Sequence, residues 1–122
     1  PLEGKTLLHY AVANLDLVKL LLIHGADVNA EDEHGNTPFH LVALCDESKN
    51  QIEIARLLLS KGANINRQNK EKASLLHIAV KKRNQTLIRF LLQNYIDINL
   101  KDAEQQTAKQ LVLQPVSYTH LT

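Results

Sequence analysis

The 122-residue sequence contains no tryptophan and no methionine, and aromatic residues make up only 4% of it. A core of this composition must rely on Leu, Ile, Val and Ala, which suits closely stacked helices better than a large irregular interior. Cys45 is the only cysteine, so an internal disulfide and a cysteine-based metal cage are both excluded. A reducing compartment is compatible with this, and we expect a cytoplasmic, intracellular protein, with export as an effector left open.

Long apolar runs are missing as well. No uninterrupted apolar stretch approaches the roughly 20 residues that a membrane helix needs, and the first residues show no signal-peptide pattern. Charge is unevenly distributed: residues 1–60 carry four Lys and Arg against nine Asp and Glu, whereas residues 61–122 carry ten against four. The acidic first half argues against nucleic acid as the partner, and we expect no membrane association.

A short string at positions 35–40, Gly-Asn-Thr-Pro-Phe-His, reads as a turn that becomes a helix. Gly35 can adopt the left-handed conformation that closes a tight turn, Thr37 can cap a helix, and Pro38 suits the first helical position. The cap position recurs, while other members of the string are lost one at a time, in residues 4–9, 72–77 and 105–110. The sequence is therefore organised as a repeat.

A second string ends each repeated unit and keeps a fixed distance to the next cap. It occupies residues 25–29, 62–66 and 95–99, and its last Asn is followed eight residues later by the Ser or Thr of the next cap. Successive copies are 37 and 33 residues apart, a period typical of solenoid repeats. Gly25 and Gly62 are expected to end a helix in the left-handed conformation.

Two helices are predicted in each unit. The first follows the cap, and the second is so apolar that it must pack against its own first helix and against the neighbouring units. First helices are predicted at residues 7–14, 38–45, 75–82 and 108–113, and second helices around the apolar residues of 17–22, 52–59 and 87–92.

The two strings in this order resemble the ankyrin repeat, whose unit reads Gly-x-Thr-Pro-Leu-His, two antiparallel helices and Gly-Ala-Asp-Val-Asn; residues 35–40 depart from it only by Phe39 for Leu. The resemblance implies an all-α repeat solenoid, in which stacked helix-turn-helix units are joined by β-hairpin or turn connectors. It places an ankyrin repeat domain at residues 1–114, with repeats at about 1–31, 32–68 and 69–101 and a partial repeat at 102–114.

Residues 115–122 lack repeat character and are interpreted as a non-native tail. Residues 116–122, Val-Ser-Tyr-Thr-His-Leu-Thr, resemble the translation of a transposon-derived sequencing adapter. We therefore expect the native protein to continue beyond Gln114.

The units also differ from one another. Unit one lacks two residues between its helices and unit two has four extra, so residues 46–50 are expected to protrude. In unit three, Lys72 and Tyr95 stand where the preceding units have Gly. A non-glycine residue in the left-handed conformation costs on the order of 1 kcal/mol, so strained or reshaped turns are expected there.

His9, His40 and His77 occupy the same position in successive units, so they should line up in a row and not converge on one metal ion. The resemblance implies that this His bonds within its turn and to the adjacent unit. No Gly-rich phosphate loop, paired-carboxylate site or nucleophile motif is present in the sequence. We therefore expect a non-enzymatic segment that uses no metal and no cofactor.

The resemblance further implies that connector tips and first helices form a concave surface that binds another protein, and that the chain is a monomer. Lys81 and Lys82 lie where the helix dipole also favours cations, so a purely structural role and a partner contact both stay open. The alternative function is a targeting or scaffold segment of a larger enzyme, channel or secreted effector. The predicted binding residues place acidic and basic tips around an apolar centre at Leu44 and Ala73; they are Glu31, Glu33, His34, Asn36, Leu44, Cys45, Gln68, Lys70, Glu71, Ala73, Lys81 and Lys82.

Overall fold

The computed structural model describes residues 6–45 and 50–113. Within them the chain forms seven α-helices and no strand, and the connectors are turns and irregular stretches, which confirms the all-α fold class. The helices are α1 (Leu7–Ala11), α2 (Leu15–Ile23), α3 (Pro38–Leu44), α4 (Gln51–Ser60), α5 (Leu75–Lys81), α6 (Gln85–Gln93) and α7 (Ala108–Leu113).

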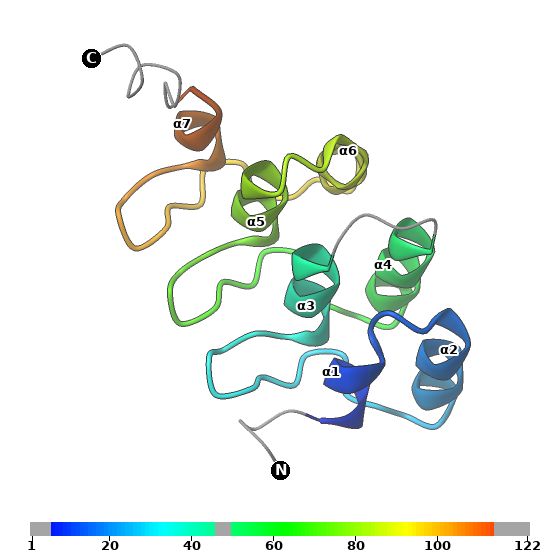
Figure 1. Cartoon of the computed structure of the whole chain (residues 1–122). Coiled ribbons are helices and arrows are strands. Elements are labelled where there is room, and N and C mark those ends of the chain that lie inside the picture. Colours follow the sequence, from blue (N-terminus) through cyan, green and yellow to red (C-terminus); the bar gives the residue numbers. More distant parts are fainter. Residues whose placement is uncertain (1–5, 46–49, 114–122) are drawn as a thin grey trace.

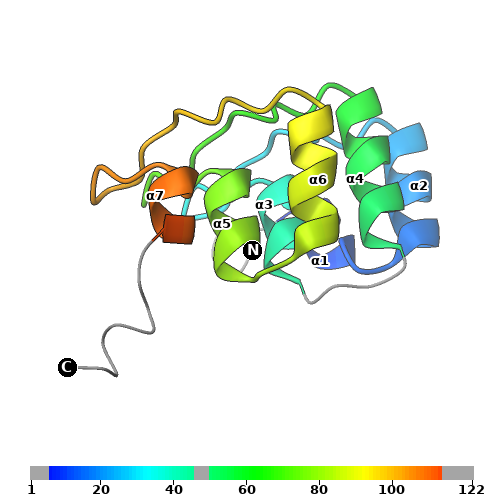
Figure 2. The same cartoon turned by 90° about the horizontal axis from the view of Figure 1, so that it is seen from above.

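The helices form two layers. Helices α1, α3, α5 and α7 follow one another in a first row, and α2, α4 and α6 form a second row beside it (Figures 1 and 2). The two helices of a pair pack on each other, and neighbouring helices within each row also pack together, so that α3 contacts both α4 and α5. Long loops precede α3, α5 and α7, and Figure 1 shows all three extending from the first row on the side away from the second row.

The first helices begin at a Thr or Ser that pairs with the side chain three residues later. The Thr37 hydroxyl accepts a hydrogen bond from the His40 backbone N–H (3.3 Å), and the Thr37 N–H donates to His40 Nδ1 (3.2 Å). At α7 the residue in the His position is Gln110, whose Oε1 accepts from the Thr107 N–H (2.7 Å). Reciprocal caps of this kind satisfy amides that a helix start leaves without partners. The same boxes form at Thr6 with His9 and at Ser74 with His77.

Each second helix is followed by a left-handed residue. The backbone N–H groups of that residue and of the next one donate to carbonyls in the last turn of the helix. Gly25 and Gly62 have φ of +85° and +94°, as predicted. Tyr95, with φ of +63°, closes the same bonds to the α6 carbonyls. Lys72 is also left-handed (φ +61°), so of the two expected outcomes, strained or reshaped turns, both substituted glycine positions keep the left-handed backbone. Arg83 (φ +56°) and Gln105 (φ +64°) are two further non-glycine residues in this conformation.

The core runs as one apolar cluster between the two helical layers. Each second helix has one side that packs against the next second helix. Val18 in α2 and Ala55 in α4 lie on this side and are completely buried. Ile88 occupies the same position in α6 and is only half-buried, while Leu92 is exposed, because no further second helix covers α6 in the described part of the chain. The largest fully buried side chains include Leu8, Phe39, Leu58, Leu75, Leu87 and Leu91.

The insertion before α4 changes how that helix starts. Asn84 caps α6 by accepting a hydrogen bond from the Leu87 N–H (3.0 Å), whereas Asn50 makes no side-chain cap on α4. The next residue, Gln51, is buried and donates from Nε2 to the Val42 carbonyl at the end of α3 (2.9 Å). Its Oε1 accepts from Asn84 Nδ2 (2.7 Å). Gln51 therefore closes α3 and links it to the start of α6.

Several sequence expectations need correction or lie outside the described residues. Helix α1 ends at Ala11 and not at Asn14, because the Asn14 side chain caps α2 instead. Helices α3 and α5 each end one residue earlier than predicted. The expected protrusion at residues 46–50 falls mainly on residues 46–49, and the interpreted tail at 115–122 falls wholly, outside the described residues. Among the helices described, none has the length and apolar character to cross a bilayer.

Candidate binding surface

The three loops and the first helices form one side of the stack, which we call the loop face; it corresponds to the predicted binding surface. Each loop is shaped by an Asp or Asn located five residues before the helix cap. Asp32 Oδ1 accepts hydrogen bonds from the backbone N–H groups of His34 (2.8 Å) and Asn36 (3.0 Å). Asn69 and Asp102 hold their loops in the same way. Sequence reasoning missed this position, although its recurrence before every long-loop cap was a visible signal.

Asp102 is ionised more readily than an ordinary Asp. The backbone N–H of Gln106, and then that of Glu104, donates to its carboxylate and lowers its pKa. Nearby Lys81 adds a smaller effect in the same direction. The third loop therefore keeps its organising charge to a more acidic pH than an ordinary Asp would.

The histidine row joins each unit to the next. A backbone carbonyl can only accept a hydrogen bond, so Nε2 of each ring carries the proton and Nδ1 is left to accept the bond from the helix cap. Burial lowers the pKa of His40, which favours this neutral form. The predicted structural role is therefore confirmed. The Nε2 partners are Asn36 O for His9 (2.9 Å), Ala73 O for His40 (3.3 Å) and Gln106 O for His77 (2.7 Å).

The first two loops are in direct backbone contact. The Lys70 N–H donates to the His34 carbonyl (2.9 Å), and a Cβ built on Gly35 would lie 2.8 Å from the Lys70 nitrogen. Gly35 is thus required both for its φ of +76° and for this close approach.

The second and third loops are joined by different hydrogen bonds. Lys72 takes the place of Gly35, and no backbone hydrogen bond joins Glu71 to Ala103, the corresponding pair, within the residues that the structure describes. Gln68 connects these loops instead, because its Nε2 donates to the carbonyls of Lys72 (2.9 Å) and Lys101 (2.8 Å). We attribute the missing backbone bond to the side chain at Lys72, since a Cβ at the equivalent Gly35 would collide with the next loop. A cavity of about 270 Å³ lies here, lined by Glu71, Ala73, His77, Lys81, Asp102, Ala103 and Glu104.

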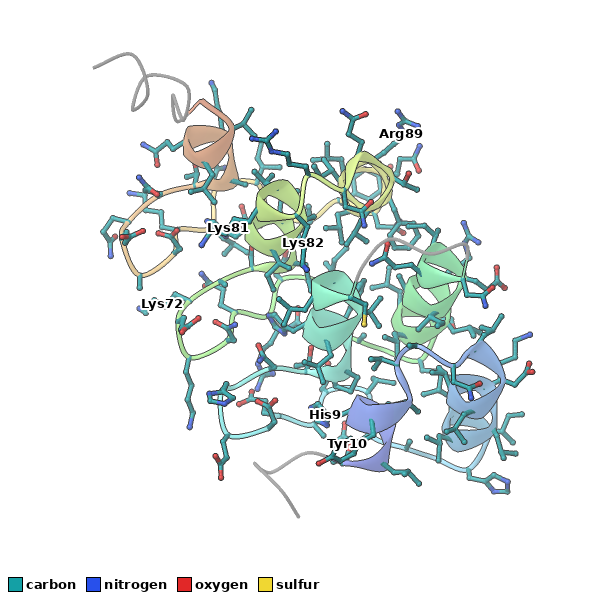
Figure 3. All side chains as sticks on the ribbon, in the orientation of Figure 1. His9, Tyr10, Lys72, Lys81, Lys82 and Arg89 are labelled. Atoms are coloured by element: carbon teal, nitrogen blue, oxygen red, sulfur yellow. The ribbon has the colours of Figure 1, made fainter. Side chains whose placement is uncertain are left out.

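A larger groove of about 400 Å³ lies on the loop face between the second unit and the third. Its apolar surface comes from Leu44, Ala73 and Ile78. Figure 3 shows Lys81 and Lys82 extending from α5, with Lys72 on the neighbouring loop and Arg89 in the other helical layer. Six of the twelve predicted binding residues line this one groove: Asn36, Leu44, Glu71, Ala73, Lys81 and Lys82.

The other six predicted residues lie outside the groove. Glu31 forms an ion pair with Arg67. The Gln68 amide donates to the carbonyls of Lys72 and Lys101. These contacts favour a structural role for Glu31 and for Gln68. Cys45 is half-buried at the end of α3. Glu33, His34 and Lys70 are exposed at the loop tips.

Comparison with known proteins identifies the repeat. Residues 8–102 match the description "Ankyrin repeats (3 copies)". A putative ankyrin repeat protein of fowlpox virus (strain NVSL) is 34% identical over 131 residues, an alignment that covers 82% of this chain and 70% of that protein. Such repeats are general protein-interaction modules.

Two longer proteins are also similar. Human transient receptor potential cation channel subfamily A member 1 is 41% identical over 106 residues, covering 83% of this chain and 9% of the channel. Mouse Rabankyrin-5 is 36% identical over 126 residues, covering 94% of this chain and 11% of that protein. The chain thus spans only a small part of these relatives, and its match along residues 8–102 shows that it belongs to the ankyrin repeat family.

Proposed function

We propose that this chain is a non-enzymatic protein-binding module whose partner docks on the loop face, over the groove between the second and third units. The observation that carries the proposal is the lining of that groove, which combines the apolar side chains of Leu44, Ala73 and Ile78 with charges of both signs. Neither Lys81 nor Glu71 forms a direct side-chain ion pair among the described residues, and Lys81 interacts with Asp102 only at longer range, so both side chains can contact a partner.

This lining favours a protein partner with paired opposite charges around an apolar contact. Charges at an interface mainly set orientation and association rate, whereas a desolvated apolar centre holds most of the affinity. The same mixture disfavours nucleic acid, because Glu71 and the exposed loop-tip Glu33 and Glu104 would repel phosphates. We further propose that the chain is a monomer and that it lies in the cytoplasm; the lack of a second cysteine for a disulfide is compatible with a reducing compartment.

The test begins with capture of a partner from the source cells, followed by affinity measurements on the purified partner. We expect Glu33→Lys, and the pair Lys81→Glu with Lys82→Glu, to weaken binding. Lys19→Glu is the matched control, because Lys19 is exposed on α2 in the other helical layer. Equal weakening by the control, or no effect of any variant, would show that the loop face is not the binding surface.

A second candidate is that the chain is a targeting or scaffold segment of a larger protein. This is supported by the small share of the human channel that it covers (9%) and by a similar share, also 9%, of the intracellular phospholipase A2 of Caenorhabditis elegans, which is 38% identical over 93 residues. Recovery of the full open reading frame tests it: a linked membrane or catalytic domain would support the segment, and an uninterrupted ankyrin stack would oppose it.

A further inference from the structure

The groove changes its chemistry from one unit to the next at a single repeated position. Leu44 lies seven residues after the cap Thr37, and Lys81 lies seven residues after the cap Ser74, so they are equivalent residues on the adjacent helices α3 and α5. Both line the same groove, and Leu44 is exposed although it is apolar. A ligand that runs along the stack therefore meets an apolar contact in one unit and a cation in the next.

The groove has a helical wall at the end of α5 and a loop wall before it, and the opposite charges of the two walls determine where an acidic ligand side chain can bind. Lys81 and Lys82 come from the helical wall, and Glu71 comes from the loop wall. An acidic ligand side chain is attracted to the helical wall and repelled by the loop wall. A run of consecutive acids would bring some of them against Glu71, so the groove favours one acid at a defined place.

The packing of α3 on α5 sets the distance between the two contacts. Packed helix axes lie about 8–10 Å apart. A peptide in the polyproline II conformation advances about 3.1 Å per residue with three residues per turn, so side chains three positions apart lie on the same side, one helix spacing apart.

We propose that the groove binds a peptide segment in the polyproline II conformation, in which an apolar residue and an acidic residue stand three positions apart, the apolar side chain on Leu44 and the acid on Lys81. This rests on the proposed function, since it specifies the segment that docks at the same surface. Either chain direction satisfies the spacing, so the proposal concerns the separation and the sign of the charge.

The probes are capped eight-residue serine peptides that carry Leu and Glu three positions apart, titrated into the isotope-labelled chain while backbone amide shifts are followed by NMR. We expect weak binding, with a dissociation constant of about a millimolar, and shifts at Leu44, Ala73 and Lys81. Replacing the peptide Glu with Gln should weaken binding about two- to fivefold, as for an exposed ion pair. Moving Glu to five positions from Leu should weaken it by a similar factor, because both contacts can no longer be made.

Variants of the chain assign the contacts. Lys81→Gln should remove the preference for Glu over Gln, Leu44→Ser should remove the preference for Leu over Ser, and Lys19→Gln should change neither. The proposal is overturned if Gln and Glu peptides bind equally, if spacing has no effect, or if no peptide shifts these amides at about 5 mM. The proposed function fails separately, when loop-face substitutions leave binding of the captured protein partner unchanged.

Discussion

Three glycines share a left-handed backbone but differ in their surroundings, and this difference predicts unequal costs of adding a methyl group. A Cβ on Gly25 or Gly62 would meet no atom within 4 Å, whereas one on Gly35 would lie 2.8 Å from the Lys70 nitrogen. At the two open sites only the backbone conformation is penalised. At Gly35 the added atom also pushes two loops apart.

The magnitudes follow from these contacts. Left-handed backbone costs an L-residue about 1–2 kcal/mol, which a less flexible unfolded chain offsets by about 0.4–1, so Gly62→Ala should cost about 1 kcal/mol. At Gly35 the collision adds about 1–3 kcal/mol, and loss of the Lys70 bond to the His34 carbonyl adds about 0.5–1.5. Gly35→Ala should therefore cost about 2.5–5.5 kcal/mol in total, a large part of the stability of a small domain.

Urea unfolding followed by circular dichroism measures the three variants against the parent chain. Gly25→Ala serves as the second open-site control and should match Gly62→Ala. Equal losses at all three positions would refute the reasoning, because they would show that the contact between the first two loops carries no energy.

Three further predictions follow from burial and titration. Leu58→Ala should cost about 2–5 kcal/mol and Leu21→Ala clearly less, because Leu58 is fully buried while Leu21 is half-buried; equal losses in urea would contradict this. Since burial lowers the pKa of His40, the unfolded chain binds protons more readily, so stability should be full above about pH 7 and fall as the pH drops below about 6.5. His40→Gln should flatten that slope in pH-dependent urea titrations, and an unchanged slope would assign it elsewhere. Tyr95→Gly should raise stability by about 0.5–1 kcal/mol in thermal melts, because Tyr95 is left-handed and 90% exposed, whereas Tyr95→Ala, which keeps the strained backbone, should not.

The helices and their caps could be predicted because local residues determine them. The Ser or Thr cap and the His that pairs with it are only three residues apart, and the left-handed helix ends were visible as Gly25 and Gly62. The end of α1 was misjudged for a local reason as well. The position of Asn14 suggested the end of α1. Its side chain instead accepts a hydrogen bond from the Leu17 N–H and caps α2.

Contacts between units were harder to predict, because they depend on how far one unit is offset from the next. Asn29 looked like the end of a repeated string, yet its side chain accepts from the Asn64 N–H (2.9 Å) and donates to the Gly62 carbonyl (3.1 Å) in the following unit. Likewise, Glu31 and Arg67 are 36 residues apart and meet only in the folded stack. The sequence analysis predicted Glu31 as a binding residue, and the stack gives its charge a partner within the chain.

The same offset separates the structural positions on the loop face from the positions that we propose contact a partner. Some positions repeat in residue type, such as the His row and the Asp or Asn before each cap. Their side chains form hydrogen bonds with neighbouring backbone groups. Other positions change residue type between units, such as Leu44 and Lys81. Their side chains line the groove. The repeated residues therefore fix the spacing of the units, and the non-repeated ones set what that spacing presents to a partner. For this reason a substitution at Lys81 should alter recognition with little loss of stability, whereas one at His40 should do the reverse.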